Sequence, residues 1–302
     1  MVSFTKTIKD IRDLKIQGAQ NIAKSSLFAL RQKAKFSKAI TKTRFLRELN
    51  EAKRLLLSSR PTEPCMRNCL NFVLFNLKGK DLSEFRINFF IKVEEALEHI
   101  KTTEKKIAEI GNNKIKNGMT IFTHCHSSTV INILKKAKQQ KKRFEVHNTE
   151  TRPLFQGRTT ATELIKLGIP VTHFVDAAAR YALKKADLML IGADAITSEG
   201  KIINKIGSEL FAEIANKFEI PIYICTDSWK FDPASVFGYE EDIEIRKSTE
   251  IWKKPPKGIK IDNYAFEKID TNLITGIISE LGVYRPEIFV EELKRNYSWM
   301  FR

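Results

Sequence analysis

The feature that most constrains the fold is a change of hydrophobic pattern after Gly118. From there on, short continuous apolar runs alternate with helical stretches. The runs are MTIFTHC (119–125), RFEVHN (143–148), PVTHFVD (170–176), ADLMLIGAD (186–194) and PIYICTD (221–227). Continuous apolar strands separated by helices are typical of a parallel sheet that is covered on both faces. The sequence therefore predicts a doubly wound α/β domain.

The preceding residues have the period of helices instead. Apolar positions recur at intervals of three and four in 45–57, 66–77 and 85–110. The turn-rich segment GNNKIKNG then separates the two patterns. We therefore expect a helical N-terminal domain over 1–112 and the α/β domain over 113–302.

Polar residues follow the predicted strands. Cys125, Asp176, Asp194 and Asp227 each stand where an apolar run ends, and Glu150 follows the second run closely. The carboxyl ends of parallel strands open on one edge of a sheet, where doubly wound folds bind their ligands. These residues predict a ligand site at that edge.

Cys125 stands between two histidines, and three interpretations compete for it. A free cysteine is most often a buried apolar residue. His124 and His126 suggest zinc, but side chains of neighbouring residues on an extended strand point to opposite faces, and no further cysteine or histidine cluster follows at ligand spacing. The third interpretation is a reactive thiol, because SSTVINILKKAK predicts a helix whose free N-terminal amides can bind phosphate and lower a thiol pKa. We expect no metal here and leave packing and reactivity open.

Asp194 and Lys205 belong to the stretch IGADAITSEGKIINKIGS. An isolated Gly-Ala-Asp is most simply a turn, but at a strand end over the same crevice Asp194 can act as a general acid. Lys205 precedes Gly207 at a predicted helix start, an arrangement that favours phosphate binding. Lys230 follows the next strand and adds a second cation.

Three further motifs offer groups for an anionic ligand. Arg152 and Arg158 in ETRPLFQGR carry forks that suit phosphate or carboxylate, although a structural salt bridge explains Arg158 equally well. Gly18 marks a break between helices that can expose backbone amides. Arg60 precedes Pro61, and we expect this proline to begin the next helix.

Together these motifs resemble one superfamily over about residues 10–285. It contains methylthioribose-1-phosphate isomerases, archaeal ribose-1,5-bisphosphate isomerases and the regulatory subunits of translation initiation factor 2B. The resembling stretches are KIQGAQNIA, RPTEPCMRN, THCHSST, ETRPLFQGR, GIPVTHFVDAAARY, GADAI, NKIGS and TDSWKFDP. RPTEPCMRN and THCHS bring the chain closest to the archaeal ribose-1,5-bisphosphate isomerases.

The resemblance implies a Rossmann-like α/β fold and the conversion of α-D-ribose 1,5-bisphosphate to D-ribulose 1,5-bisphosphate, without a cofactor. It implies Cys125 as proton acceptor and Asp194 as proton donor. The implied substrate contacts are Gln17, Gly18, Ala19, Gln20, Arg60, Ser127, Ser128, Thr129, Asn204, Lys205 and Lys230. Family members commonly have arginine where this chain has Gln17, which weakens one phosphate contact.

Two alternatives stay open within the same superfamily. A regulatory subunit of the initiation-factor type shares the fold without catalysis, and such subunits generally lack the cysteine. A methylthioribose-1-phosphate isomerase acts on a substrate with one phosphate instead of two. The presence of both Cys125 and Asp194 favours an enzyme, and the two cations Arg60 and Lys230 favour the bisphosphate.

Charge and composition limit the partners. The net charge of +16 comes mostly from lysines on predicted helix faces, and no basic surface interleaved with aromatic residues is evident, so we do not expect nucleic-acid binding. No apolar run approaches the roughly 18–20 residues of a membrane span, and the first residues lack the apolar core of a signal peptide. Four cysteines without framework spacing favour a cytoplasmic protein. The resemblance implies a homo-oligomer, either a dimer or a hexamer, that binds a phosphorylated sugar.

Overall fold

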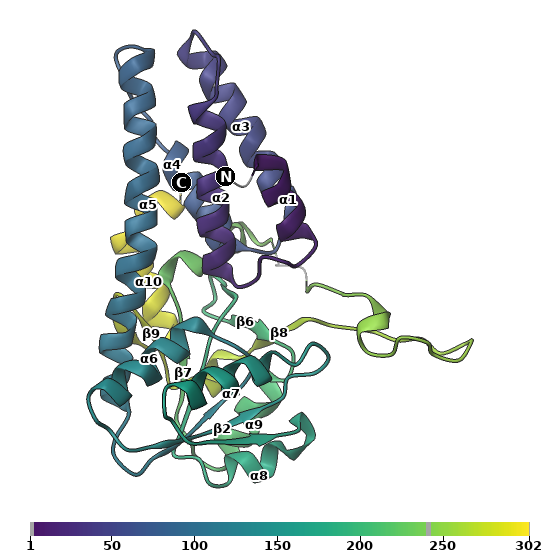
Figure 1. The fold of residues 1–302 in the computed structure, drawn as a ribbon. Coiled ribbons are helices and arrows are strands. Elements are labelled where there is room, and N and C mark those ends of the chain that lie inside the picture. Colours follow the sequence, from purple (N-terminus) through teal and green to yellow (C-terminus); the bar gives the residue numbers. More distant parts are fainter. Residues whose placement is uncertain (1–2, 240–242, 302) are drawn as a thin grey trace. The chain divides into compact units, whose positions relative to one another are not determined.

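The computed structural model describes residues 3–239 and 243–301. The chain forms two compact units (Figure 1). The helical unit comprises Met1–Thr102, Trp229–Phe231 and Tyr297–Arg302, and the α/β unit comprises Thr103–Ser228 and Asp232–Asn296. The domain boundary that the sequence predicts at residue 112 stays a prediction.

The first part of the chain is helical, as its periodicity predicts. Its helices are α1 (Phe4–Arg12), α2 (Ala19–Lys35), α3 (Lys42–Ser59), α4 (Pro64–Leu74) and α5 (Leu82–Gly111). The prediction for Pro61 is wrong, because this residue lies in a turn and Pro64 takes the first helical position of α4. Across the described ranges of the chain, no helix combines the length and the apolar character that crossing a membrane requires.

Aromatic rings build the core of the helical unit. Phe45 of α3 is fully buried and packs edge-to-face against Phe85 and Phe89 of α5, with ring centroids 6.3 and 6.0 Å apart. The guanidinium of Arg86 lies 4.6 Å from the centroid of the Phe45 ring. Such edge-to-face pairs stabilise a core beyond the area that they bury.

Asn68 ties a distant segment into the helical unit. Its side-chain nitrogen donates to the backbone carbonyls of Trp229 and Phe231, at 2.8 and 2.7 Å, and Asn68 itself is fully buried. Trp229 also stacks on His99 of α5, with centroids 3.9 Å apart. These contacts hold the three residues around Lys230 in the helical unit.

The α/β unit is built on a seven-stranded sheet of order β10-β9-β7-β4-β1-β2-β3, in which every pair is parallel except β10 with β9. The strands are β1 (Thr120–Thr123), β2 (Glu145–Thr149), β3 (Val171–Phe174), β4 (Leu188–Ile191), β7 (Ile222–Cys225), β9 (Gly276–Ser279) and β10 (Gly282–Tyr284). A smaller antiparallel sheet contains β5 (Ala195–Ile196), β6 (Ile202–Lys205) and β8 (Phe266–Ile269). The helices of this unit are α6 (Ser128–Gln139), α7 (Gln156–Lys166), α8 (Ala179–Leu183), α9 (Ser208–Lys217) and α10 (Pro286–Asn296).

Neighbouring residues of β1 show that both faces of the large sheet are covered. Ile121 belongs to a buried cluster with Ile133 and Leu134 of α6, together with Leu164 of α7. Phe122 points to the other face and packs on Phe211 of α9, with centroids 5.2 Å apart. Because side chains alternate along a strand, helices on both sides are required to bury these two residues. The predicted doubly wound α/β fold is confirmed.

All five predicted strands are present, as β1, β2, β3, β4 and β7. The sequence did not indicate β9, β10 or the small sheet. The apolar residues of those strands come in runs of at most three that glycine or polar residues interrupt, so they do not stand out in the sequence.

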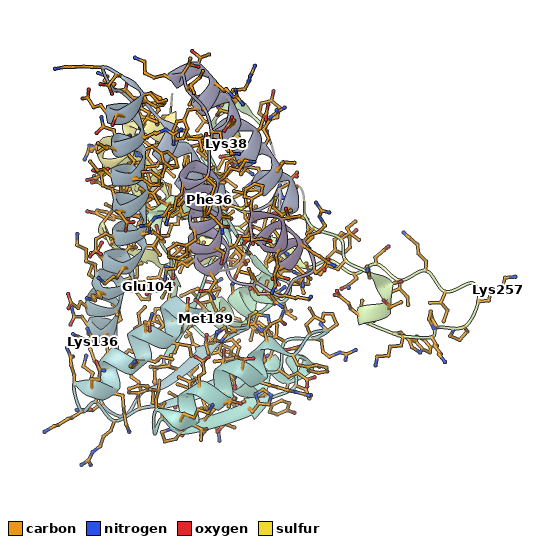
Figure 2. All side chains as sticks on the ribbon, turned by 45° about the horizontal axis from the view of Figure 1, so that its top comes forward. Phe36, Lys38, Glu104, Lys136, Met189 and Lys257 are labelled. Carbon is orange, nitrogen blue, oxygen red and sulfur yellow. The ribbon has the colours of Figure 1, made fainter. Side chains whose placement is uncertain are left out.

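A long segment leaves the body of the α/β unit (Figure 1). We call residues 247–262 the arm, and Lys257 lies at its far end (Figure 2). At its base, the amide of Arg246 donates to the Asn263 carbonyl at 2.8 Å. Along its length the arm exposes the large apolar side chains of Trp252 and Ile259, each by 47%.

We expect the Asn68→Ala variant to unfold at lower urea concentration than the native chain. The substitution removes the donor from two buried carbonyls, which costs about 1–3 kcal/mol of the free energy of unfolding. Asn50→Ala, at an exposed position of α3, is the matched control. Equal urea midpoints for the Asn68→Ala variant and the native chain would show that these two hydrogen bonds do not hold segment 229–231.

Candidate active site

Two threonine hydroxyls fix the backbone of Cys125, just beyond β1. The Cys125 amide donates to Oγ1 of Thr151 at 3.0 Å, and Oγ1 of Thr160 donates to the Cys125 carbonyl at 2.8 Å. Cys125 has φ 64°, a left-handed conformation that few residues other than glycine adopt. The two hydrogen bonds offset the cost of this conformation and hold the half-buried thiol at the sheet edge.

The predicted extended backbone at Cys125, which would place its two histidine neighbours on the opposite face from the thiol, is wrong. The chain turns at Cys125 instead. His124 and His126 are each engaged elsewhere. Nδ1 of His126 lies 3.1 Å from Oγ1 of Thr160, and because this hydroxyl already donates to Cys125, the histidine nitrogen is the donor.

His124 is buried and hydrogen-bonded on both sides of its ring. Nε2 lies 2.9 Å from the Ile206 carbonyl, which can only accept, so Nε2 carries the proton and Nδ1 accepts from the Thr149 hydroxyl at 2.7 Å. Burial lowers the pKa of His124 to about 4, although the Ile206 hydrogen bond and the charge of Asp176 oppose this shift. Gly207 has φ 99°, and a Cβ there would lie 3.3 Å from Nε2 of His124, so glycine suits this position.

Asp176 has a structural part in the site. It follows β3, and its two carboxylate oxygens accept from the amides of Thr151 and Arg152, at 2.9 and 2.7 Å. Thr151 also has a positive φ, of 62°. The carboxylate therefore holds the turn that presents the Thr151 hydroxyl to Cys125.

Asp194, Asn204 and Lys205 come together where the two sheets adjoin. The Asp194 amide donates to the Ile203 carbonyl at 2.8 Å, which brings the end of β4 next to β6. Lys205 is the last residue of β6 and only 7% exposed, and its ammonium lies 4.5 Å from the centroid of the Phe266 ring. Nδ2 of Asn204 donates to Oγ of Ser208 at 3.0 Å.

The thiol of Cys125 and the ammonium of Lys205 act on each other. Burial raises the pKa of Cys125 to about 11, while the charge of Lys205 lowers it and that of Asp194 raises it. Burial also lowers the pKa of Lys205, and interaction with Cys125 opposes that change. Desolvation of the thiolate is therefore the largest effect on the pKa of Cys125, and a lowering of that pKa by the helix that follows stays a prediction.

The predicted helix after Cys125 is present as α6. Ser127 is its N-cap and accepts from the Val130 amide at 3.4 Å. Ser128 is exposed and Thr129 is buried. A Cβ at Gly192 would lie 2.7 Å from Oγ of Ser127, so glycine allows β4 and α6 to approach each other. Phosphate binding by residues 127–129 stays a prediction.

Arg158 forms the salt bridge that the sequence left open. It pairs with Glu150 at 3.2 Å, and its guanidinium lies 3.8 Å from the centroid of the Phe155 ring. Arg152 likewise lies over Phe155, at 5.0 Å.

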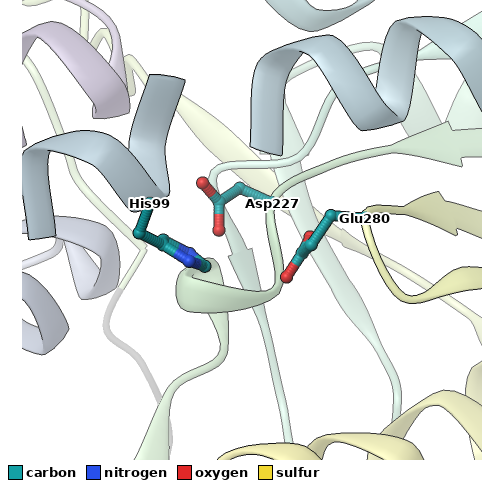
Figure 3. A group of neighbouring side chains, drawn as sticks. All are labelled: His99, Asp227 and Glu280. Carbon is teal, nitrogen blue, oxygen red and sulfur yellow. The ribbon is translucent and has the colours of Figure 1, made fainter. Parts of the chain in front are cut away.

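Two carboxylates follow the neighbouring strands β7 and β9 (Figure 3). Asp227 is fully buried directly beyond β7, at the predicted strand end. Glu280 follows β9 and accepts from both the amide and the hydroxyl of Ser228, the amide at 3.2 Å.

The remaining predicted ligands belong to the helical unit. Gly18, with φ 82°, is the N-cap of α2 and provides no side-chain cap. Gln17 uses its amide nitrogen to donate to the Leu14 carbonyl at 2.7 Å, and Ala19 is buried in the first turn of α2. Gln20 is only 6% exposed, and within residues 3–239 and 243–301 neither of its amide atoms has a hydrogen-bond partner.

Arg60 and Lys230 are both buried in the helical unit. Arg60 ends α3, and its Nε lies 3.4 Å from a carboxylate oxygen of Glu63. Lys230 lies between the two carbonyls that Asn68 holds. That these residues and those of the α/β unit bind one substrate stays a prediction.

Comparison with known proteins places the chain in a family. The model of the initiation factor 2 subunit family matches residues 15–286. The chain belongs to this family. A ribose 1,5-bisphosphate isomerase of Pyrococcus furiosus is 36% identical over 302 residues, with 97% of this chain and 93% of the relative covered. A methylthioribose-1-phosphate isomerase of Pelotomaculum thermopropionicum is 32% identical, with 99% and 87% covered.

Solved structures agree with this family assignment. A Pyrococcus horikoshii protein described as translation initiation factor eIF-2B is 26% identical, with a TM-score of 0.83, and the match covers 95% of this chain and 98% of that chain. A 5-methylthioribose 1-phosphate isomerase of the same organism has a TM-score of 0.77 at 23% identity, covers 97% and 88%, and shows the shared fold.

Sequence reasoning missed the threonines that bond Cys125 and its neighbour His124. Thr149 ends β2 and Thr151 lies two residues further on, so the strand-end rule could have found both. Thr160 lies in the first half of α7 and carries no local signal. Arg246, discussed below, lies in an irregular segment without periodicity.

We expect the free energy of unfolding to fall below pH 6.5 because of His124. Above that pH the imidazole is neutral in both states. Between about 6.5 and 4 the unfolded chain binds a proton that the folded chain refuses, so the contribution lost by pH 5 is about 2 kcal/mol. Urea unfolding at pH 7.5 and pH 5 measures the loss.

His124→Gln should remove this part of the pH dependence. His173→Gln, at an exposed position of β3, should leave it unchanged. The same pH dependence in His124→Gln and the native chain would contradict the assignment.

Proposed function

We propose that this chain is a sugar-phosphate isomerase that converts α-D-ribose 1,5-bisphosphate to D-ribulose 1,5-bisphosphate. The observation that carries the proposal is that Cys125 is held half-buried at the carboxyl end of β1, next to His124, which bonds to the residue after the buried Lys205. The amide of Asp194 bonds to β6, the strand that ends in Lys205. A thiol and a carboxyl group close to a cation can move protons on a bound anionic sugar. The P. furiosus relative, aligned over nearly its whole length, supports this substrate.

In the proposed reaction, the ring must open before the carbon skeleton can isomerise, because the anomeric carbon carries a phosphate. Asp194 donates a proton to the ring oxygen as the bond between C1 and that oxygen breaks, and the electron pair of this bond stays on the oxygen. The Cys125 thiolate removes the proton from C2, and the electron pair of that bond forms the C1–C2 double bond of an enol phosphate. The Cys125 thiol then returns a proton to C1 while the Asp194 carboxylate takes the hydroxyl proton at C2, which gives the ketone and restores both side chains.

The proposal assigns the two phosphates to groups that the family pattern implies. In the helical unit these are the first turn of α2 with Gln20, Arg60 and Lys230. The buried amide of Gln20, which has no partner within the described ranges, supports a ligand at the uncapped start of α2. In the α/β unit the groups are the start of α6 and the pair Asn204 and Lys205.

Phosphorus resonances of α-D-ribose 1,5-bisphosphate, followed with the pure protein, test the reaction. We expect ribulose 1,5-bisphosphate to appear, and Cys125→Ser and Asp194→Asn each to lower turnover by about 10²-fold or more. Cys225→Ser, at a buried thiol within the same sheet, is the matched control. Nearly full turnover by Cys125→Ser would exclude Cys125 as the proton acceptor.

A second candidate function is favoured by the Pyrococcus horikoshii structure described as an initiation factor. On this alternative the chain is a non-catalytic regulatory subunit. Methylthioribose 1-phosphate tested beside the bisphosphate separates three possibilities. Turnover of the bisphosphate alone supports the proposal, turnover of the monophosphate indicates the other isomerase, and turnover of neither favours the regulatory subunit.

We also propose that the chain forms a homo-oligomer through the arm. A projecting segment that exposes Ile251, Trp252 and Ile259 is an apolar surface of the kind that binds another chain. We expect Trp252→Glu to lower the mass measured by light scattering in solution, because the change buries a charge in the contact. Lys257→Glu at the tip of the arm is the control, and an unchanged mass for Trp252→Glu would exclude the arm.

A further inference from the structure

Phe266 holds two nearly buried cations on one ring, and the backbone that follows Lys205 reaches the residue before Cys125, because the Ile206 carbonyl accepts from Nε2 of His124 at 2.9 Å. The ammonium of Lys205 lies 4.5 Å from the ring centroid, and the guanidinium carbon of Arg246 lies 5.8 Å from it. Lys205 is 7% exposed, and the side chain of Arg246 is 9% exposed. Burying a cation is unfavourable unless nearby groups compensate it. Two such cations around one ring therefore concentrate positive charge in this part of the α/β unit.

The base of the arm holds Arg246 in place. Its amide donates to the Asn263 carbonyl at 2.8 Å, and the Ala265 amide donates to the Glu244 carbonyl at 2.9 Å, so the two sides of the base are paired like a short hairpin. Nε of Arg246 donates to a carboxylate oxygen of Glu244 at 3.1 Å. Glu244 therefore compensates part of the charge of the guanidinium.

The charges around the thiol come from several elements. Groups that act on Cys125 are Lys205 at the end of β6, Asp194 beyond β4, the amide of His126 and Arg246 at the base of the arm. The two cations lower the pKa of the thiol, whereas burial and Asp194 raise it. Arg246 also lowers the pKa of Lys205, and Glu244 raises it, so both groups of the arm base act within this charge network.

We propose that Arg246 is a positioning residue for the Cys125 thiolate, acting together with Lys205 through their shared contact with Phe266. Its part is electrostatic. The guanidinium adds to the positive charge of Lys205 when the thiol gives its proton to solvent, and Glu244, which is paired with Arg246, offsets part of that charge. The inference deepens the proposed isomerase, in which Cys125 must be ionised to accept a proton from the substrate.

Alkylation of Cys125 by iodoacetamide tests the inference without any sugar phosphate. The full chain is labelled between pH 7 and 10, and the Cys125 peptide is quantified by mass spectrometry, which separates it from the other cysteines. Below the thiol pKa the rate changes tenfold for each unit of pKa, so we expect Arg246→Gln to slow alkylation at pH 8 by about threefold or more. Arg246→Lys keeps the charge and should stay closer to the native rate.

Glu244→Gln tests the inference because it should change the alkylation rate of Cys125 in the direction opposite to Arg246→Gln. Removing this carboxylate leaves the charge of Arg246 uncompensated, so alkylation of Cys125 should become faster. The glutamine can still accept from Nε of Arg246, so this variant and Arg246→Lys decide the question even if Arg246→Gln fails to fold. Arg295→Gln, on α10 and paired with Glu292, is the control.

Equal rates for Arg246→Gln and the native chain would overturn the inference. So would slower alkylation in both Arg246→Gln and Glu244→Gln, because that pattern indicates damage to the base of the arm and not a change of charge. Loss of isomerase activity plays no part in these outcomes. A chain that fails to isomerise ribose 1,5-bisphosphate can still show the opposite shifts, so failure of the inference and failure of the proposed function are separate results.

Discussion

The carboxyl ends of parallel strands share one edge of a sheet, and the candidate site of the α/β unit depends on this constraint. β1, β2, β3, β4 and β7 run in one direction, so the chain leaves each of them at the same edge. Helices on both faces leave that edge as the place where polar groups can collect. Cys125, Asp176, Asp194 and Asp227 therefore gather there, although long stretches of sequence separate them.

Hydrogen bonds fix the position of the Cys125 thiol, whereas burial changes its pKa. Thr151 and Thr160 fix the backbone, which decides where the sulfur lies. Burial then makes the thiolate costly, with the thiol pKa raised to about 11, and Lys205 works against that cost. A thiolate in such surroundings depends on the cations around it, so the residues that carry those charges matter as much as the cysteine.

The fold followed from the sequence wherever local pattern and burial agree. Five apolar runs became five parallel strands, and Cys125 and Asp194 lie beyond the ends of β1 and β4, as the strand-end rule predicts. Sequence patterns did not predict those features of the structure that tertiary contacts decide. No local signal indicates that Cys125 adopts a left-handed backbone, that Asp176 serves two amides, or that Arg246 reaches the site from an irregular segment. The helix next to Cys125 is visible in the sequence, whereas the desolvation that raises the pKa of this thiol is not.

The hydrogen bonds of Asn68 have a consequence for how this protein can be divided or recombined. Segment 229–231 belongs to the helical unit although its neighbours on both sides belong to the α/β unit, and Tyr297–Arg302 returns to the helical unit as well. The polypeptide thus passes between the units four times. A gene fragment that ends near residue 102 lacks two pieces of the unit it is meant to encode. A single crossover between the genes of two relatives would combine pieces of different origin within one unit, so the two units are expected to be inherited together.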